Sequence, residues 1–537
     1  MFRGIELILR GRDPREAWIW AQRICGVCTT VHALASVRAV ENAIGVEVPD
    51  NARLVRSLIA GSQNVQDHII HFYHLHALDW VDVTLALKAD PAKTSQIAQS
   101  ISEWPKSSTT YFKGVQDRVK TLVASGQLSL FSSGDWGHPA YQLPPEINLL
   151  AVAHYIEALE LQRDFIRIHA VLGGKNPHPQ SYLVGGMSTA IDANEAEAVI
   201  NPERITLMNQ LVSRAQTFVK QVYLPDVMAV AGGYRDWFHY GEGLGNFMAY
   251  GDYPSGSIND TAMFAFPRGI ILNRDLSTVH SLDPKNVTEY VTHSWYEYSE
   301  GDQVGKHPSQ GETKPSYSGP KPPYEYLKTD EKYSWLKSPR YEDKSMEVGP
   351  LARVLIAYAS GNEGIKKRVD ATLAKLNLPA TALYSTMGRI AARALEADFM
   401  ADMLPVWLQE LNNNMAHGNV RIHNGEKWDP ESWPKSCQGF GLEEAPRGSL
   451  GHWVEIENKK IVNYQAVVPS TWNAGPRDAH GQRGAYEAAL LKTPIADPER
   501  PLEILRTVHS FDPCLACAVH VIDAAGRRYG RKQVPVS

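Results

Sequence analysis

The chain has 537 residues, of which 43% are hydrophobic and 21% charged, a composition typical of a globular protein with three or four ordinary domains or one large one. Its 54 Lys and Arg residues against 59 Asp and Glu give a net charge of −5, which argues against nucleic acid or an anionic membrane surface as a partner. No apolar run approaches the roughly eighteen residues of a spanning helix, and the first thirty residues lack a signal-peptide pattern, so we expect any membrane or periplasmic location to depend on a partner.

Helical periodicity is the strongest structural signal along the chain. Apolar residues at helical spacing predict helices over these segments: 50–83, 146–173, 201–225, 350–372 and 379–412. The second is expected to end at Gly173-Gly174, Asn201 caps the third, and Pro405 is expected to kink the last. The histidines between residues 68 and 76 spread around the first helix, so we interpret them as packing or surface residues rather than metal ligands.

Short strands and one polar stretch lie between the predicted helices. Glycine and aromatic residues alternate with short apolar runs over 232–282, which predicts small strands, and residues 451–468 alternate as a hairpin around Asn458-Lys459. The polar stretch 300–345 is rich in Tyr, which favours an ordered excursion over a linker. We find no internal repeat and no clean domain boundary. We therefore expect a mainly α, α+β fold: one large single-domain helical bundle with small sheets at its edges.

Four of the five cysteines form two Cys-x-x-Cys pairs near opposite ends of the chain, Cys25 with Cys28 and Cys514 with Cys517, and only Cys437 stands apart. Thiolates are soft ligands that select zinc, copper(I), nickel or iron–sulfur centres, and this spacing lets both sulfurs face one ion. A single pair would more often be a redox disulfide or half of a zinc site, and so few cysteines do not form a disulfide framework. Two pairs with different surroundings favour one shared, buried metal centre, for which a closed structural zinc site is the alternative.

The residues around these pairs resemble the large subunit of nickel–iron hydrogenases, in particular the membrane-bound uptake type. The resemblance rests on Arg23-Ile24-Cys25-Gly26-Val27-Cys28 near the start and Asp512-Pro513-Cys514-Leu515-Ala516-Cys517-Ala518-Val519-His520 near the end. Four further segments also match: 2–6, 11–14, 445–448 and 468–477. The resemblance covers essentially the whole chain and implies an α-rich fold that buries the metal centre in its helical bundle.

This resemblance implies a nickel–iron centre and a magnesium ion. Cys25 and Cys514 match the terminal nickel ligands, while Cys28 and Cys517 match ligands that bridge to an iron carrying cyanide and carbon monoxide. Three more positions match the ligands of Mg²⁺: the Glu6 carboxylate, the Ala466 backbone carbonyl and the His520 imidazole. Oxygen ligands suit Mg²⁺, whereas an imidazole is less usual.

Heterolytic cleavage of H2 needs a Lewis acid and a nearby base, because H2 is a weak acid without a polar group. The resemblance implies that Arg447, beside Pro446, lies over the open side of the iron and that Asp67 and Asp512 hold its guanidinium. With Cys514, these residues form the expected catalytic group. A buried arginine without such partners would be costly, and the alternative interpretation is an ordinary structural ion-pair cluster.

Four further positions match residues that surround the centre or lead to it. Ser470 matches a hydroxyl that donates to a cyanide ligand, and His32 matches a histidine that hydrogen-bonds a bridging thiolate. Val27 and Leu75 match residues at the narrow inner end of a gas channel, although core packing explains both equally well.

The chain has too few cysteines for both a nickel–iron centre and iron–sulfur clusters, so electrons must leave through another protein. The resemblance implies a heterodimer with an iron–sulfur small subunit, which the loop carrying His178 would face. It also implies a membrane cytochrome b anchor, a maturation protease and nickel-insertion chaperones. We expect the chain at the periplasmic side of the cell membrane, as a peripheral protein exported with the small subunit.

Two alternative functions belong to relatives of the same ancestry. A hydrogen-sensing regulatory subunit would hold the same centre, but sensors of this type usually end at the histidine that matches His520. A metal-free structural subunit of a respiratory complex would have lost the cysteines that this chain keeps. We therefore expect an uptake hydrogenase that oxidises H2 and passes electrons towards quinone.

Each end of the chain carries a further expectation. The tail 521–537 has four basic residues and directly follows His520, which is assigned to a buried site. Because burying unpaired charge is costly, we expect cleavage after His520. This cleavage would leave one domain of residues 1–520. The family normally begins with a segment containing Arg-x-Glu-Gly-His, whose glutamate carries protons outward, and this sequence does not occur in the chain. We therefore expect that the N-terminal part is truncated or its start misassigned, with Met1 an internal methionine.

Overall fold

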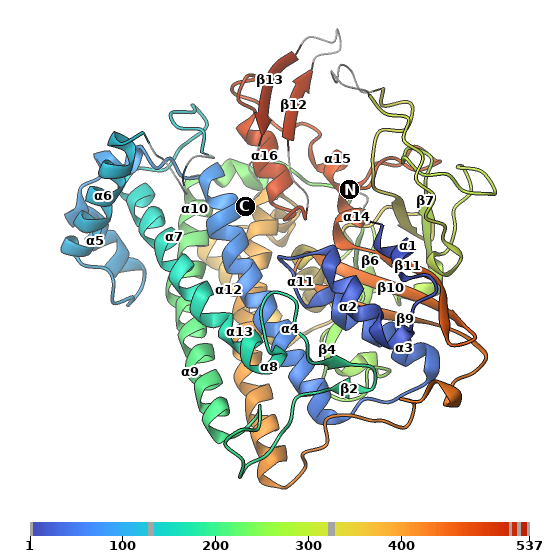
Figure 1. Cartoon of the computed structure of the whole chain (residues 1–537). Coiled ribbons are helices and arrows are strands. Elements are labelled where there is room, and N and C mark those ends of the chain that lie inside the picture. The colour runs from blue at the N-terminus through green and yellow to red at the C-terminus, as the bar shows by residue number, and fades with distance from the viewer. Residues whose placement is uncertain are drawn as a thin grey trace.

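Helices predominate in the computed structural model, which describes residues 4–126, 131, 134–320, 328–514, 518–522 and 528–533, the last two segments by their backbone alone (Figure 1). The helices of the first half are α1 (Ile5–Leu9), α2 (Ala17–Ala21), α3 (Val31–Ile44), α4 (Asp50–Ile70), α5 (Pro91–Ile101), α6 (Thr109–Ala124), α7 (Pro145–Phe165), α8 (Arg167–Gly173), α9 (Pro202–Phe218) and α10 (Leu224–Gly233). Those of the second half are α11 (Pro350–Ala359), α12 (Glu363–Leu376), α13 (Thr386–Ala416), α14 (Pro469–Ala474), α15 (Ala485–Ala489) and α16 (Leu502–His509).

The described strands pair antiparallel in small sheets. The largest sheet has the order β11-β10-β9, formed by β9 (Ser436–Ala445), β10 (Gly448–Glu457) and β11 (Lys460–Val467). The others are two-stranded: β1 (Tyr182–Leu183) with β2 (Gly186–Met187), β3 (Phe247–Ala249) with β6 (Gly269–Ile271), β4 (Asp252–Pro254) with β5 (Phe264–Phe266), β7 (Val287–Tyr290) with β8 (Ser338–Tyr341), and β12 (Ala518–Ile522) with β13 (Arg528–Gln533).

The predicted helix over 201–225 is longer in the structure. The Asn201 side chain accepts a hydrogen bond from the backbone N–H of Arg204 and so caps α9 as expected. A π-helical turn, Val219–Tyr223, then leads into α10, and the helical path ends only at Gly233. Pro225 does not stop it, because proline is tolerated in the first turn of a helix, where its missing N–H is not needed.

The predicted helix over 350–372 is two helices. The chain turns at Gly361, whose φ of 79° favours glycine, and Asn362 then caps α12 by accepting from the N–H of Ile365. The last predicted helix, in contrast, continues without a break through Pro405 to the end of α13.

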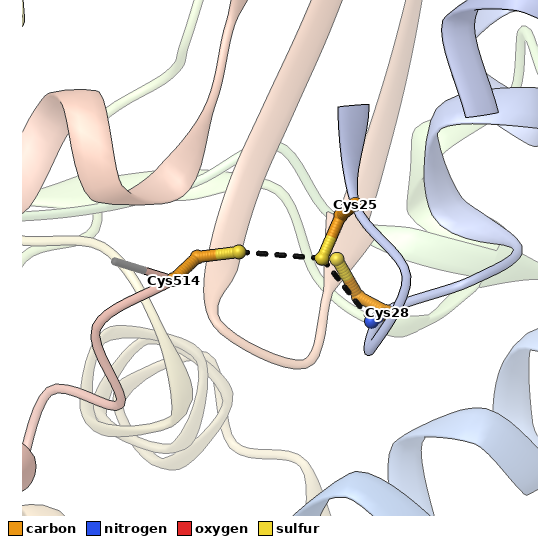
Figure 2. A group of neighbouring side chains, drawn as sticks. All are labelled: Cys25, Cys28 and Cys514. Atoms are coloured by element: carbon orange, nitrogen blue, oxygen red, sulfur yellow. Dashed lines mark hydrogen bonds between the residues drawn. The ribbon is translucent and has the colours of Figure 1, made fainter. Parts of the chain in front are cut away.

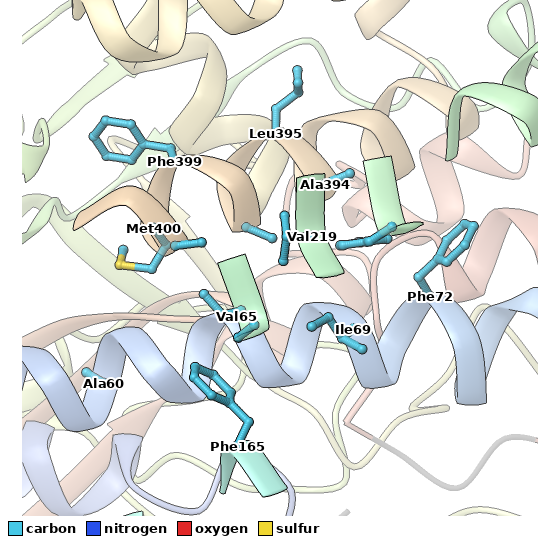
Figure 3. Packing of buried hydrophobic residues seen from close by; sticks show 14 of the residues in the cluster. Ala60, Val65, Ile69, Phe72, Phe165, Val219, Ala394, Leu395, Phe399 and Met400 are labelled. Carbon is cyan, nitrogen blue, oxygen red and sulfur yellow. The ribbon is translucent and has the colours of Figure 1, made fainter. Parts of the chain in front are cut away.

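Helices α4 and α13 pack closely in the main hydrophobic core. A Cβ atom on Gly61 of α4 would lie 2.8 Å from the Trp407 ring and 3.0 Å from the Met400 sulfur of α13, so only glycine permits this approach. Figure 3 shows side chains of both helices, among them Val65 and Ala394, meeting in this core. The packing fixes α4, which carries Asp67, relative to α13.

Helix α3 lies on the three-stranded sheet. A Cβ atom on Gly441 would be 2.0 Å from the Ala35 carbonyl oxygen, and one on Gly439 would be 2.4 Å from the Ala43 nitrogen. The backbone of β9 therefore contacts the backbone of the helix directly. This contact brings the segment that precedes α3 close to the turn between β9 and β10.

The predicted hairpin is confirmed, with Asn458 and Lys459 at its turn in left-handed conformations, φ 48° and 67°. The described part of 300–345 is ordered, and Tyr317 stacks on Trp335 with ring centroids 5.6 Å apart. The expected mainly α fold with small sheets at its edges is confirmed.

Within the described part of the chain, the structure contains no helix with both the length and the apolar character needed to cross a membrane.

Candidate metal centre

Three of the four paired cysteines meet at one point (Figure 2). Cys25 and Cys28 lie just before α3, and the Cys514 side chain extends towards them from the segment after α16. The Sγ atoms of Cys25 and Cys514 are 3.3 Å apart, and all three sulfurs lie within 4.8 Å of one another. Cys517 lies outside the described residues, so its expected part remains a prediction.

The three sulfurs compete for protons. Hydrogen bonds from Cys28 and Cys514 lower the pKa of Cys25 far below its ordinary value, whereas the Cys25 sulfur raises the pKa of Cys28 strongly and that of Cys514 to about 11. Only one thiolate is therefore favoured while no cation is bound, because like charges at this distance repel. A bound cation would stabilise all of them as thiolates, so the donor set fits a soft metal centre. Among the described residues, no other group of three or more Cys, His, Asp and Glu side chains is close enough to share a metal ion.

The two-residue turn between β9 and β10, Pro446-Arg447, carries an arginine to this site. The Nε–H of Arg447 donates to the Asp512 carbonyl oxygen over 3.1 Å, and Nη2 lies 2.9 Å from Asp512 Oδ1. Nη1 lies 3.6 Å from Asp67 Oδ2, and at most 5% of any of these side chains is exposed. The structure thus brings together the arginine and both expected carboxylates, and their part in catalysis remains a prediction.

Burial and charge act in opposite directions on this group. Burial alone would lower the pKa of Arg447, but Asp512, the Cys514 thiol and Asp67 outweigh it and hold that pKa well above its usual range. Burial raises the pKa of Asp67 well above the ordinary value, and Arg447 offsets only part of this increase. The guanidinium therefore stays positively charged, and burial makes the Asp67 carboxylate more basic than an ordinary aspartate.

A second layer of buried charge lies behind Asp512, and the sequence interpretation missed it. Arg393 Nη1 lies 3.5 Å from Asp512 Oδ2 and 3.3 Å from His68 Nδ1, and His68 Nε2 lies 2.9 Å from Glu396 Oε1. Burial lowers the pKa of His68 to about 4, so the ring is neutral and links the arginine to the glutamate. We interpreted the histidines of this segment as packing or surface residues, and the helical pattern alone carries no sign of these partners.

Gln63 is another residue that the sequence interpretation missed. Its side-chain amide donates to Asp67 Oδ1 over 2.6 Å and to the Val27 carbonyl oxygen over 3.1 Å. Its position four residues before Asp67 on one helix face was the available signal. Gln63 thus connects the Asp67 carboxylate to the first cysteine segment.

Ser470 and His32 also lie at the site. The Ser470 hydroxyl oxygen, in the first turn of α14, accepts from the backbone N–H of Cys514 over 3.2 Å, which leaves its own proton for another acceptor. His32 Nδ1 lies 3.0 Å from His452 Nε2, and His452 Nδ1 lies 2.6 Å from the Tyr464 hydroxyl. A buried hydrogen-bonded chain therefore leads from His32 into the protein.

A cavity of about 160 Å³ adjoins the sulfurs and contains part of the expected magnesium site. Its lining includes Glu6, His32, Lys337, Arg447, Ala466 and Cys514. Glu6 Oε1 accepts from the Ala466 backbone N–H over 3.0 Å, and the Thr313 hydroxyl donates to Oε2. These contacts place the Glu6 carboxylate beside Ala466, as a metal site shared by these two residues requires. The His520 side chain is outside the described part of the structure, so the full ligand set remains a prediction.

The remaining expected residues lie around the cysteine segment. Val27 is 45% exposed and Leu75 is half-buried, and their gas-channel role remains a prediction. The backbone N–H of His178 donates to the Thr29 hydroxyl, which holds the His178 loop against the segment that carries Cys25 and Cys28.

Comparison with known proteins identifies the family. The family profile described as nickel-dependent hydrogenase matches residues 3–520. The chain belongs to this family. The uptake hydrogenase large subunit of Bradyrhizobium diazoefficiens is 50% identical over 548 residues, covering 99% of this chain and 91% of that protein. The hydrogenase-1 large chain of Escherichia coli K12 is 50% identical over 540 residues, covering 98% and 90%.

Solved structures agree with this family assignment. The [NiFeSe] hydrogenase of Desulfovibrio vulgaris Hildenborough superposes with a TM-score of 0.74 at 32% identity, covering 96% of this chain and 91% of that chain. That of Desulfomicrobium baculatum gives a TM-score of 0.72 at 32% identity, covering 96% and 92%. The predicted hydrogenase large-subunit fold is therefore confirmed. The prediction of a nickel–iron uptake hydrogenase subunit, an oxidoreductase, is also confirmed, and it is favoured over the sensor and scaffold alternatives.

Proposed function

We propose that this hydrogenase subunit oxidises H2 to protons and electrons at a nickel–iron centre held by Cys25, Cys28, Cys514 and Cys517. The observation that supports this most strongly is the meeting of three thiols from opposite ends of the chain beside a buried, charged arginine. Such a centre, when bound, supplies the Lewis acid that H2 cleavage requires, and we propose that its iron carries CN and CO ligands.

The protein's own groups position charge and accept the proton. We assign to the Cys514 sulfur, which would be a terminal ligand of the centre, the role of the base that takes the proton from H2. Arg447 provides a fixed positive charge and N–H donors at the cavity beside the sulfurs, because Asp512 holds its guanidinium in one orientation. Asp67, whose pKa is raised, is the next group able to hold a proton. The Arg447 and Asp67 side chains are at most 5% exposed, which limits the access of water to them.

Metal content and activity test this proposal together. The purified large subunit with its partner should contain one nickel per chain and reduce a viologen dye with H2. Cys25→Ser should lose both, whereas Cys437→Ser, at a half-buried cysteine on β9, should keep both. Zinc in place of nickel in the wild-type protein would instead support the closed structural site.

Partners and location belong to the same proposal. Hydrogenase large subunits pair with a small subunit, and we assign the iron–sulfur clusters to it. The loop at His178, held against the first cysteine segment, is the proposed contact. We further propose a cytochrome b anchor and a peripheral position at the periplasmic side of the membrane. Cell fractionation with and without the small-subunit gene tests this, because the large subunit alone should stay in the cytoplasm.

A magnesium ion is proposed at Glu6, the Ala466 carbonyl and His520. Its support is the Glu6 carboxylate, which borders the cavity beside Ala466. Glu6→Gln should reduce the magnesium content while leaving the nickel content unchanged. Equal magnesium in both proteins would contradict this site.

Maturation by proteolysis after His520 completes the proposal, with a protease and nickel chaperones as partners. The position lies inside β12, which pairs with β13, so cleavage would divide the first strand of this hairpin and release the second. Intact mass of the protein from its native host should correspond to a chain that ends at His520. Active enzyme that keeps residues 521–537 would contradict this.

A further inference from the structure

Arg353 of α11 is 1% exposed, and each of its five guanidinium hydrogens has an acceptor. Nε donates to Glu396 Oε2 over 2.8 Å, and Nη2 donates to Glu396 Oε1 over 2.6 Å. The three remaining hydrogens bind next to the turn: Nη1 to Glu444 Oε2 at 2.7 Å and to the Ala445 carbonyl at 2.8 Å, and Nη2 to the Pro446 carbonyl at 3.0 Å. Arg353 therefore binds the two carbonyl groups that directly precede Arg447.

The start of α11 contacts the same turn from another side. A Cβ atom on Gly448 would lie 2.7 Å from the Gly349 nitrogen, and one on Gly349 would lie 3.1 Å from the Arg447 carbonyl oxygen. Gly349 is the residue before α11, and Arg353 follows one helical turn later. The start of α11 therefore contacts both the beginning of the turn, through Arg353, and its end, through Gly349.

Glu396, which orients Arg353, also holds the helix that carries Asp67. It accepts from Asn64 Nδ2 over 2.7 Å and lies 2.9 Å from His68 Nε2, and both residues are on α4 within one turn of Asp67. The Glu396 carboxylate therefore contacts both Arg353, which binds the turn before Arg447, and α4, which carries Asp67.

We propose that Arg353 is a positioning residue for the reaction: it holds the Ala445-Pro446 backbone so that the Arg447 guanidinium lies at the metal centre. This inference rests on the role proposed above for Arg447. Arg353 itself lies behind the turn and acts only through it.

The test replaces Arg353 with lysine, which keeps the charge but has three donors instead of five and no planar fork. Arg56 provides a matched control. It is buried, binds Glu41 through two contacts of 2.9 and 2.6 Å, and donates to the backbone carbonyls of Leu183 and Gly186, which flank the turn between β1 and β2, over 3.0 Å each. It has the same chemistry as Arg353 but supports a different loop, at the opposite end of α4 from Asp67.

In the purified heterodimer, Arg353→Lys and Arg56→Lys should have similar metal content and similar melting temperatures. Arg353→Lys should lower kcat at least tenfold with KM for H2 within twofold, and amide hydrogen exchange over 445–449 should become at least tenfold faster. Arg56→Lys should speed exchange only over 183–186 and leave kcat within twofold. Unchanged exchange over 445–449 in Arg353→Lys overturns the inference, whatever the activity.

Exchange and activity also separate this inference from the proposed function. Faster exchange over 445–449 with wild-type kcat would support the inference that Arg353 holds the turn. It would contradict the role proposed for Arg447. If Arg353→Lys does not fold, Arg353→Met combined with Glu444→Gln decides, because this double variant removes the donors to the Ala445 and Pro446 carbonyls together with the charge of Glu444 that Arg353 neutralises. Slow, wild-type exchange over 445–449 in the folded double variant would overturn the inference.

Discussion

Arg447 combines a rigid position with a charge that its surroundings do not allow it to lose. Its three contacts to Asp512 and Asp67 involve all three guanidinium nitrogens, and Arg393 contacts the other carboxylate oxygen of Asp512. A lone buried charge would be expelled or neutralised, whereas this arrangement alternates cations and anions. Arg447 therefore provides a preorganised positive potential at the cavity beside the cysteines.

Arg447→Lys is expected to keep the metals and lose about 100-fold in kcat. A lysine ammonium keeps the charge but cannot reproduce the planar fork, and removing one preorganised donor typically costs a factor of about 10²–10³ in rate. Viologen reduction with H2, normalised to nickel content, measures the effect. Arg477→Lys is the control, because that arginine is 28% exposed and its nearest carboxylate, Asp330, is 3.8 Å away. Activity near wild type in Arg447→Lys would show that the arginine is only structural.

At the scale of elements, the site depends on how closely α3 lies on β9. The cysteine segment leads into α3 and the arginine turn follows β9, so the distance between these two elements sets the distance between the sulfurs and the guanidinium. Gly441 permits the contact, since its Cα faces the Ala35 carbonyl of the helix without a side chain between them.

Gly441→Ala is expected to destabilise the protein by about 1–3 kcal/mol, the usual cost of forcing an extra methyl group into a packed interface. The new Cβ would lie 2.0 Å from the Ala35 oxygen, so helix and strand must separate. Gly114→Ala is the matched control: Gly114 is exposed within α6, nothing lies within 4 Å of its Cβ position, and alanine should stabilise the helix by about 0.5–1 kcal/mol. Thermal unfolding compares the two, and equal melting temperatures would contradict the close contact.

At the scale of the whole molecule, many histidines are buried as neutral rings. Burial lowers the pKa of His68, His74 and His169 to about 4, far below the value of about 6.5 in an unfolded chain. Between pH 6.5 and pH 4 the unfolded chain therefore binds protons that the folded protein does not. The folded state loses stability as the pH falls through this window, and each such ring adds up to about 1.4 kcal/mol per pH unit.

The melting temperature is accordingly expected to fall steeply from pH 6.5 to pH 4. His169→Gln should reduce that slope, because the amide removes one of the titrating rings and can still hydrogen-bond the Ser62 hydroxyl, which lies 3.0 Å from His169 Nε2. Differential scanning calorimetry at several pH values measures both slopes, with pH 7 as the reference for the effect of the substitution itself. Identical slopes in the two proteins would contradict the assignment.

The sequence alone determined the features that depend on local pattern or on the identity of rare residues. Helical spacing and the Asn201 cap predicted helix α9, and two Cys-x-x-Cys pairs in a chain with one other cysteine predicted a shared centre. These signals are local because a cap, a period or a ligand pair acts within a few residues. Even so, helical spacing missed the turn at Gly361, which divides the predicted helix 350–372 into α11 and α12.

Only the tertiary structure decided which distant charges meet. No local sequence pattern distinguishes Arg353, Arg393 or Glu396 from other charged residues. Their importance is seen only in their contacts with residues on other elements. Buried charges need opposite charges and hydrogen bonds from every side, and those partners come from helices and turns hundreds of residues apart. The sequence therefore predicted which residues bind the metals, whereas the packing of α4, α11 and α13 around one turn decided how Arg447 is held beside the three cysteines.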